Sequence, residues 1–302
     1  EPRQDRLDAL AEEMGVPEAY RFHHWAELLA QPKLADCAFV CTLDDDHTEP
    51  ALKAMELGYH LLLEKPMAPT PQECKAITEA VHQAGAKKVY LVEKPFAAAL
   101  GSNLPVYDPI GSMVVDIGGG TSEIAVISLG DIVTAQSLRI AGDDLDQAII
   151  NHMRKKHNLL IGERTAEQIK IDIGSAKPYE GETSIEIKGR NVIDGLPKNV
   201  TITSAEVRDA MLDTITQIID AIRSTLEKTP PELSADIIDS GITLTGGTAL
   251  LRGLAELIAE ETGMPVSIAA NPLDCVVMGA AKRLEGDIGF SNYTFRRGKR
   301  FR

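Results

Sequence analysis

The pattern of hydrophobic and polar residues over the first part of the chain predicts helices and strands in alternation. Apolar residues recur at helical spacing over residues 7–14, and residues 38–42 form a short apolar run typical of a buried strand. A helix is predicted over residues 50–57, ended by Gly58, and a strand over residues 60–63 follows directly. Because strands joined by a helix pair in parallel through a right-handed crossover, this order predicts a parallel α/β segment.

The pattern changes after about residue 85. Runs rich in β-branched residues predict three strands, over residues 112–117, 123–128 and 132–140. The first two are joined by Gly118–Thr121, and the third follows a turn at Gly130. Strands that follow one another so closely can pair only as an antiparallel meander, which we therefore expect here.

Apolar residues then recur at helical spacing over three segments, 144–157, 165–176 and 203–228. The last segment begins with a capping box made by Thr203 and Glu206, and it ends before the two prolines at 230 and 231. Alternating isoleucine and valine between residues 184 and 202 predict two more strands. We expect a compact insertion of helices with a small sheet in this region.

The end of the pattern predicts two short strands, each followed by a helix: strand 242–244, helix 249–262, strand 266–269 and helix 273–284. Gly263 is placed to end the first of these helices. The loop Thr245-Gly-Gly-Thr248 connects the first strand to its helix, so two glycines precede a helix N-terminus there.

Composition narrows the possible functions. The chain of 302 residues has 45 acidic and 31 basic residues, a formal charge of −14, which disfavours a surface built to hold nucleic acid. Its four cysteines show no metal-ligand spacing, and this favours a reduced, cytoplasmic protein. Residues 289–302 are an exception to the acidic balance, because they form a basic tail that is either a solvated end or a contact with an anionic membrane. The chain begins with Glu1 rather than methionine, and we expect further sequence upstream.

Two glycine-rich loops carry the candidate chemistry. Asp116 stands at a strand end directly before Gly118–Thr121, so bare amide groups there can approach a phosphate while the carboxylate reaches Mg²⁺ through water. The alternative is a hairpin turn that holds no ligand. Gly246 and Gly247, between a buried strand and a helix, suit the approach of a phosphate or a base, or else form a tight connection.

Glu167 and Lys170 stand three residues apart on a predicted helix and therefore share a face. Such a pair can bind ribose hydroxyls and stack against adenine. An ordinary surface ion pair is the alternative.

The first 85 residues resemble the Rossmann domain of the Gfo/Idh/MocA oxidoreductases, through CTLDDDH at residues 41–47 and GYHLLLEKP at residues 58–66. The resemblance implies that Lys65 lies near the nicotinamide of NAD(P). The family's glycine-rich fingerprint and its substrate domain have no counterpart in this chain, which leaves no cradle for the pyrophosphate. Lys65 is otherwise the end of a strand beside a proline turn.

The chain from about residue 86 to 286 is similar to the MreB family of bacterial actins, in the actin and heat-shock-chaperone ATPase superfamily. Five ordered segments carry this resemblance: KKVYLVEKP at 87–95, GSMVVDIGGGT at 111–121, LLIGERTAE at 159–167, TLEKTPPEL at 225–233 and LTGGTALLRG at 244–253. It implies an ATP-binding, filament-forming protein of the cytoplasm, which lies under the inner membrane and guides the cell-wall synthesis machinery in rod-shaped cells.

The resemblance also assigns roles to particular residues. Asp116 would position Mg²⁺ through water, and Thr121 would keep a weak catalytic role. The implied nucleotide-binding residues are Asp116, Gly118, Gly119, Gly120, Thr121, Glu167, Lys170, Gly246, Gly247 and Thr248.

Two departures from the family pattern affect the expected activity. The family carries glutamate at the position of Lys94, where it orients the attacking water, and a charged lysine cannot accept a proton, so hydrolysis should be impaired. The first phosphate loop and most of the first domain have no counterpart, because the oxidoreductase-like segment stands in their place up to a junction at residues 83–86. The alternatives are therefore an oxidoreductase fragment, or a chimeric protein in which both halves are inactive.

The expected fold class is α/β. An actin-like (ribonuclease H-like) second domain with an inserted small α+β subdomain follows a partial Rossmann-like parallel segment. The expected boundaries are 1–85 for the Rossmann-like segment, 86–110 for a remnant of the first actin-like domain, 111–143 and 209–288 for the second-domain core, 144–208 for the insertion and 289–302 for the basic tail.

Overall fold

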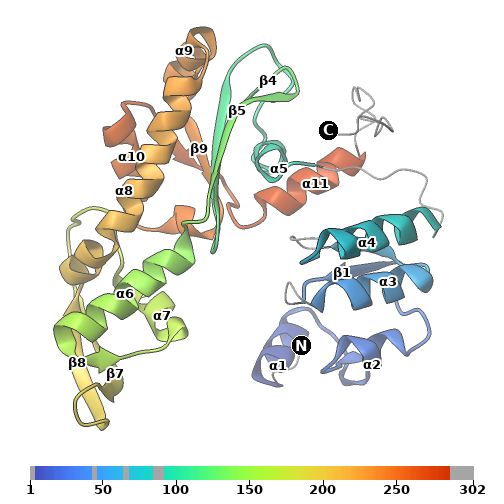
Figure 1. Ribbon diagram of the computed structural model, residues 1–302, viewed down its shortest axis with the longest axis horizontal. Coiled ribbons are helices and arrows are strands. Elements are labelled where there is room, and N and C mark those ends of the chain that lie inside the picture. Colours follow the sequence, from blue (N-terminus) through green and yellow to red (C-terminus); the bar gives the residue numbers. More distant parts are fainter. Residues whose placement is uncertain (1–3, 43–45, 64–67, 84–91, 286–302) are drawn as a thin grey trace. The chain divides into compact units, whose positions relative to one another are not determined.

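The computed structural model of the chain describes residues 4–42, 46–63, 68–83 and 92–285. The chain divides into two compact units, Glu1–Leu91 and Val92–Arg302, and each is described here by itself (Figure 1). Residues 84–86 of the predicted junction and the whole basic tail lie outside the described residues.

The N-terminal unit holds a two-stranded parallel sheet. Strand β1 (Cys37–Val40) pairs with β2 (His60–Leu63), and α3 (Thr48–Glu56) connects them, which confirms the predicted strand-helix-strand unit. The other elements of this unit are α1 (Gln4–Glu13), η1 (Glu18–Tyr20), α2 (Trp25–Leu29) and α4 (Pro71–Gln83). A small core between α3 and α4 includes the buried side chains of Met55 and Ile77.

A five-stranded sheet in the order β10-β9-β3-β4-β5 forms the centre of the C-terminal unit (Figure 1). Its strands are β3 (Ser112–Ile117), β4 (Ser122–Ser128), β5 (Asp131–Leu138), β9 (Ile242–Thr245) and β10 (Val266–Ile268). Strands β3, β4 and β5 pair antiparallel, which confirms the predicted meander, whereas β9 runs parallel to both β3 and β10.

Strand β3 is buried on both faces of the sheet. Met113 and Val115 face the larger core, against α6 (Gly142–His157) and α8 (Ser204–Lys228), while Val114 faces a smaller core with α5 (Lys94–Gly101). A strand covered on both faces reads as a continuous apolar run rather than an alternating one. The apolar run in the sequence therefore predicted the bounds of β3, residues 112–117, correctly.

A second, three-stranded sheet lies between α6 and α8 along the chain. Strand β6 (Leu159–Leu160) pairs with β7 (Ser184–Asn191), which pairs antiparallel with β8 (Pro197–Thr203). Helix α7 (Glu163–Ile173) lies between β6 and β7 in sequence. Two of these strands were predicted, and the two-residue β6 is too short to leave a pattern.

Helix α8 begins with the predicted capping box. The hydroxyl of Thr203 accepts a hydrogen bond from the amide of Glu206 at 3.3 Å, and the amide of Thr203 donates to Oε2 of Glu206 at 3.1 Å. The two residues thus satisfy amide groups that a helix start leaves without partners.

Replacing Thr203 by alanine is expected to lower the free energy of unfolding by about 1 kcal/mol, because the cap is lost while little apolar contact changes. Urea denaturation followed by circular dichroism measures the change. Thr216→Ala is the matched control, since Thr216 is exposed in the middle of α8 and its replacement should leave stability the same or slightly higher. Equal effects of the two changes would contradict the capping role.

The predicted helix over residues 249–262 is wrong at its start. A 3₁₀ turn, η3 (Gly247–Leu250), comes first, and α10 (Leu254–Thr262) begins only after Gly253. Gly253 has φ of 74°, a left-handed conformation that no continuous right-handed helix contains. Helix α9 (Pro231–Ser240), which begins at the proline predicted to end α8, was not predicted.

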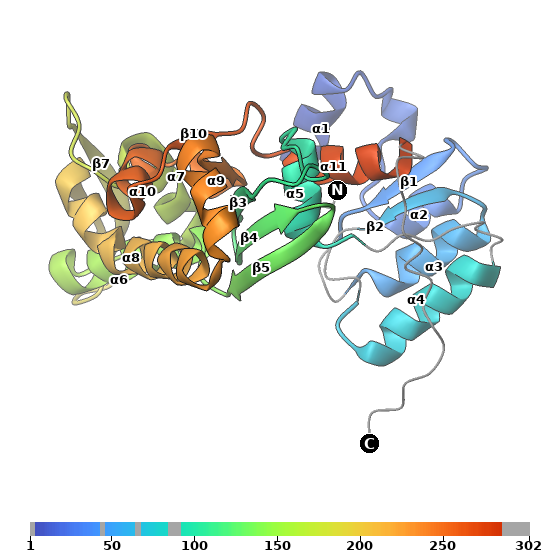
Figure 2. The same cartoon turned by 90° about the horizontal axis from the view of Figure 1, so that it is seen from above.

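Helices α5 and α11 (Cys275–Glu285) pack closely against each other (Figure 2). A Cβ atom on Gly101 would lie 1.7 Å from the carbonyl oxygen of Cys275, and one on Gly279 would lie 1.8 Å from that of Ala97. Both distances are far inside van der Waals contact. Only glycine therefore fits at these two crossing points.

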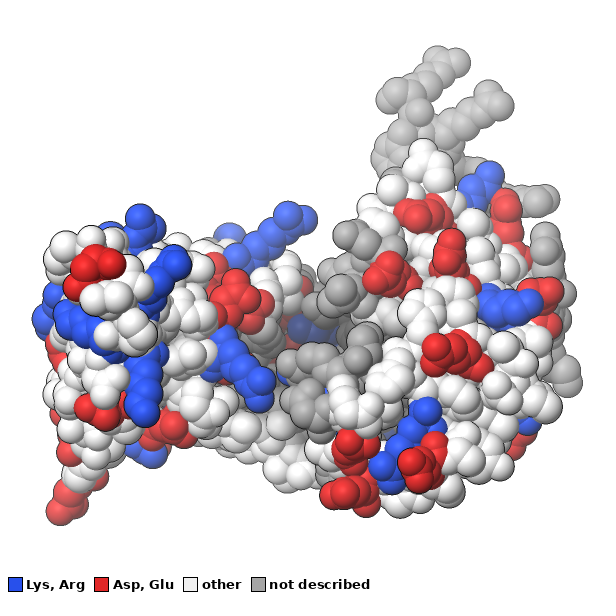
Figure 3. Space-filling view, turned by 90° about the horizontal axis from the view of Figure 1, so that it is seen from below, with Lys and Arg blue, Asp and Glu red and all other residues white. Residues whose placement is uncertain are grey.

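Charges of both signs lie interspersed over each unit on the face drawn in Figure 3. Within the described part of the chain, every helix is too short or too polar to cross a bilayer.

Candidate functional site

Asp116 lies where two parallel strands end together. It pairs in register with Thr245 across β3 and β9, so the loops that follow these strands leave the same edge of the sheet. The Asp116 side chain is buried, and its Oδ1 accepts a hydrogen bond from Oγ1 of Thr245 at 2.8 Å.

Lys94, the first residue of α5, neutralises this carboxylate. Its Nζ lies 2.5 Å from Oδ2 of Asp116, and the two side chains are 21% and 3% exposed. Both carboxylate oxygens of Asp116 therefore have partners, one cationic and one neutral. The sequence predicted only that Lys94 removes a base, and it gave no sign of this ion pair.

The first glycine loop follows β3 and is held by the start of α6. The amide of Gly118 donates to the carbonyl of Thr121 at 3.0 Å, and the amides of Gly142 and Asp143 donate to Gly118 and Gly119 at 3.1 and 2.8 Å. A Cβ on Gly119 would lie 3.0 Å from Oδ1 of Asp143. Glycine thus lets the loop approach α6 closely.

The second glycine loop lies directly against the first. Oγ1 of Thr248 donates to the carbonyl of Gly118 at 2.9 Å, and a Cβ on Gly247 would lie 3.2 Å from Cδ2 of Leu273. Gly246 has φ of 85°, and a Cβ there would lie 2.3 Å from the carbonyl oxygen of Ile117. The structure therefore brings the two predicted loops together, although they are more than a hundred residues apart in sequence.

Lys170 of α7 forms an ion pair and a hydrogen bond with residues of α6. Its Nζ lies 2.9 Å from Oδ2 of Asp146 and donates to the carbonyl of Gly142 at 3.0 Å, so it ties α7 to the first turns of α6. Burial raises the pKa of Asp146, an effect that Lys170 opposes. Glu167 is exposed on the same helix. The roles of Glu167 and Lys170 at an adenosine remain predictions.

Sequence reasoning missed two acidic residues at this site, Asp143 beside the first loop and Asp146 under Lys170. The sequence feature that could have indicated them is their position in the first two turns of α6, which begins at Gly142. Acidic residues are common there because they complement the helix dipole, so the pattern alone does not indicate a site.

The residues around Asp116 do not fit Mg²⁺ while the ion pair is intact. Lys94 already engages Oδ2 of Asp116 and Thr245 engages Oδ1, and the positive charge of Lys94 repels a second cation. Among the described residues, no group of three histidine, cysteine or carboxylate side chains gathers at Asp116. No step is therefore assigned to Mg²⁺ in this chain.

Lys65 and the loop residues 43–45, where the N-terminal parallel strands end, lie outside the described residues. The predicted place of Lys65 beside a nicotinamide therefore stays a prediction.

Two protein-family models match the chain. The first, described as MreB/Mbl protein, matches residues 52–288. The second, described as an oxidoreductase family with an NAD-binding Rossmann fold, matches residues 1–94. Both resemblances found in the sequence are thus confirmed.

Curated relatives resemble the chain over about three quarters of its length. The cell shape-determining protein Mbl of Bacillus subtilis is 50% identical over 216 residues, which are 72% of this chain and 65% of Mbl. The cell shape-determining protein MreB of Escherichia coli K12 is 50% identical over 220 residues, which are 73% of this chain and 63% of that protein. The chain thus spans slightly less than two thirds of the length of these relatives.

Solved structures confirm the predicted actin-like fold. MreB 5 of Spiroplasma citri bound to AMPPNP has a TM-score of 0.71 at 34% identity and covers 81% of this chain and 78% of its own. The same protein bound to ADP has a TM-score of 0.67 at 37% identity, covering 74% and 70%. The MamK double helical filament matches at 0.59 and 22% identity, over 75% and 68%, which supports the fold alone.

Proposed function

Because the chain belongs to the MreB/Mbl protein family, we propose that it is an actin-like cytoskeletal protein of rod cell-shape determination, with a site for an adenine nucleotide. One observation carries the proposal, namely that the loops after β3 and β9 lie against each other at one edge of the sheet. The solved relatives bound to ADP and AMPPNP support the choice of ligand.

In this proposal the phosphates bind at the first glycine loop and the adenosine binds at the second loop and α7. The backbone amides of a glycine loop beside a helix start favour an anion. Lys94 lies close to this loop, with its Nζ 3.7 Å from the point that a Cβ on Gly118 would occupy, and Asp116 balances its charge. The residues assigned to the nucleotide are Gly118, Gly119, Gly120, Thr121, Glu167, Lys170, Gly246, Gly247 and Thr248.

The same lysine limits the chemistry of the proposed site. Asp116 is held by Lys94, so it is not available to hold Mg²⁺ through water, and Lys94 cannot accept a proton from an attacking water while it is charged. Thr121 alone gives at most weak catalysis. We therefore expect binding that depends little on Mg²⁺, and hydrolysis that is slow or absent.

Self-association into filaments is part of the proposal and rests on the membership of the MreB/Mbl protein family. Contacts with the cell-wall synthesis machinery, and with an anionic membrane through the basic tail at the cytoplasmic face, are part of the proposal.

NAD(P) binding by the N-terminal unit is the second candidate function. It is supported by the family match over residues 1–94 and by the parallel pairing of β1 and β2.

Replacing Gly120 by aspartate is expected to abolish nucleotide binding without unfolding the protein. The nearest atom to a Cβ on Gly120 is Oδ2 of Asp143 at 3.8 Å, so a side chain fits, but its charge repels phosphate. The measurement is the melting temperature with and without AMPPNP, which should rise in the wild-type chain because a ligand that binds only the folded state stabilises it.

The matched control is Gly120→Ala, which adds bulk without charge and should keep the nucleotide-dependent rise. NADH in the same assay tests the second candidate. An undiminished rise with AMPPNP in Gly120→Asp would place the nucleotide elsewhere.

A further inference from the structure

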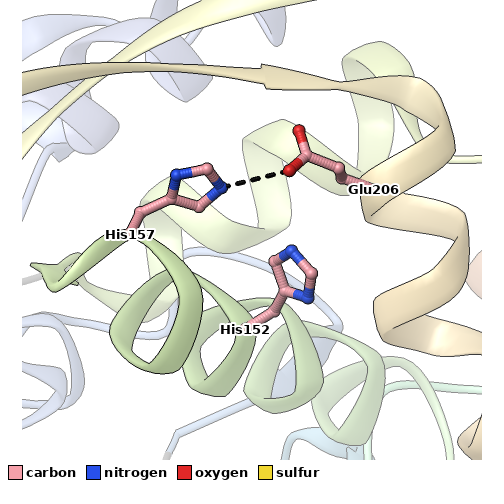
Figure 4. Close-up of side chains that lie close together, drawn as sticks. All are labelled: His152, His157 and Glu206. Carbon is pink, nitrogen blue, oxygen red and sulfur yellow. Dashed lines mark ion pairs between the residues drawn. The ribbon is translucent and has the colours of Figure 1, made fainter.

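Two histidines and a glutamate form a cluster where α6 ends and α8 begins (Figure 4). His152 and His157 come from the last turns of α6, and Glu206 comes from the first turn of α8. One nitrogen from each imidazole and one carboxylate oxygen all lie within 4.8 Å of one another. All three side chains are half-buried.

One nitrogen of each imidazole in this cluster is buried without a hydrogen bond among the described residues. Nε2 of His152 and Nε2 of His157 are buried atoms without a hydrogen-bond partner among the described residues. Nε2 of His157 lies 3.3 Å from Oε1 of Glu206. A buried nitrogen without a hydrogen bond costs free energy in the folded state, and a metal ion would satisfy Nε2 of His152 while joining Nε2 of His157 to Glu206.

We propose that His152, His157 and Glu206 bind a divalent transition-metal ion, for which Zn²⁺ is the best match. Two imidazoles and a carboxylate are donors that Zn²⁺ accepts, with a water as the fourth ligand. Tetrahedral zinc ligands lie about 3.4 Å apart, so small side-chain rotations of roughly 1 Å close the site.

The charges around the cluster include some that favour binding of the metal ion and one, on Lys156, that opposes it. Burial lowers the pKa of His152, so its imidazole is neutral at pH 7, and the hydrogen bond from Lys156 lowers the pKa of Glu206 to about 2, so its carboxylate is ionised. Lys156 itself competes for the site, because its Nζ lies 2.7 Å from Oε1 of Glu206. The Lys156 side chain is 54% exposed and is free to turn into solvent when the ion binds.

The metal site is separate from the proposed nucleotide site. The glycine loops meet the first turn of α6, whereas His157 is its last residue, fifteen positions after Gly142. At about 1.5 Å of rise per residue the two ends are roughly 20 Å apart. Failure of metal binding would therefore leave the proposed function untouched.

The test uses the full chain, stripped of metal with EDTA, in a background where the exposed Cys37 and Cys41 are serine so that thiols do not bind the probe. Zn²⁺ is titrated by calorimetry, and Co²⁺ is added as a spectroscopic probe of nitrogen and oxygen ligands. We expect one equivalent to bind, and His152→Gln and His157→Gln each to weaken the affinity by at least about tenfold.

Two further variants sharpen the test. His60→Gln removes an exposed histidine of the N-terminal unit and should leave the affinity unchanged. Lys156→Gln should tighten binding several-fold, because the competing cation is lost, and a merely structural role of the cluster would not produce this gain. Circular dichroism confirms that each variant is folded. Absence of stoichiometric Zn²⁺ binding, or equal affinities in the wild type and both histidine variants, would overturn the proposal.

Discussion

Replacing Lys94 by glutamate is expected to make the stability of the chain depend on Mg²⁺. The new carboxylate would lie beside Oδ2 of Asp116, where Lys94 now lies at 2.5 Å, and the Asp116 side chain is only 3% exposed. Two carboxylates so close together repel each other, and Asp116 loses Lys94 as its cationic partner. Without metal we expect the free energy of unfolding to fall by about 2–3 kcal/mol, after allowance for the partial exposure of Lys94.

Millimolar Mg²⁺ should recover most of this loss, because the pair of carboxylates supplies oxygen ligands for a hard cation. The measurement is thermal unfolding by circular dichroism with and without Mg²⁺. For a unit of this size the recovery corresponds to roughly 5–10 °C in melting temperature.

Lys94→Met is the control that separates charge from shape. It loses the ion pair and should also be destabilised, but it gains no ligand and should not respond to Mg²⁺. A wild-type chain that Mg²⁺ stabilises as strongly as Lys94→Glu would show that Lys94 does not hold the cation position.

Replacing Gly279 by leucine should separate α5 from α11 and expose Cys275. Even the first carbon of the new side chain would lie 1.8 Å from the carbonyl oxygen of Ala97, and a backbone atom cannot turn aside as a side chain does. We expect a loss of about 3–5 kcal/mol, at the upper end for overpacking, because the backbones themselves must move apart.

The readout is the reactivity of Cys275 with a thiol reagent, in a background where the other three cysteines are serine. Cys275 is 3% exposed and burial raises its pKa, so the wild-type thiol should react slowly. In Gly279→Leu the rate should rise at least about tenfold, since local opening is no longer needed. Met278→Leu changes an exposed neighbour on the same helix and should leave the rate as it is.

The sequence was most informative where local pattern and burial agree. The apolar run of β3 and the capping box at Thr203 were predicted at the residue level, because each depends on neighbours in the chain. The helix predicted to begin at Ala249 failed because a single left-handed glycine, Gly253, outweighs an apolar pattern that continues through it.

The sequence predicted the glycine loops of the candidate site but not the ion pair within it. Two glycine loops after predicted strands were visible in the sequence, and the fold places them side by side. The ion pair of Lys94 with Asp116 was not visible, because it depends on where the first turn of α5 lies against the end of β3. A motif therefore located the site, whereas only the tertiary structure shows which oxygens are already engaged.

The packing of α5 against α11 also constrains the order in which the protein is made. Helix α5 is synthesised well before α11, the last described element, and at about 5–20 residues per second the interval is on the order of ten seconds or more. During this time the buried alanines of α5 have no partner helix. The C-terminal unit therefore completes this packing only after α11 has been synthesised, and until then the apolar face of α5 is open to chaperones.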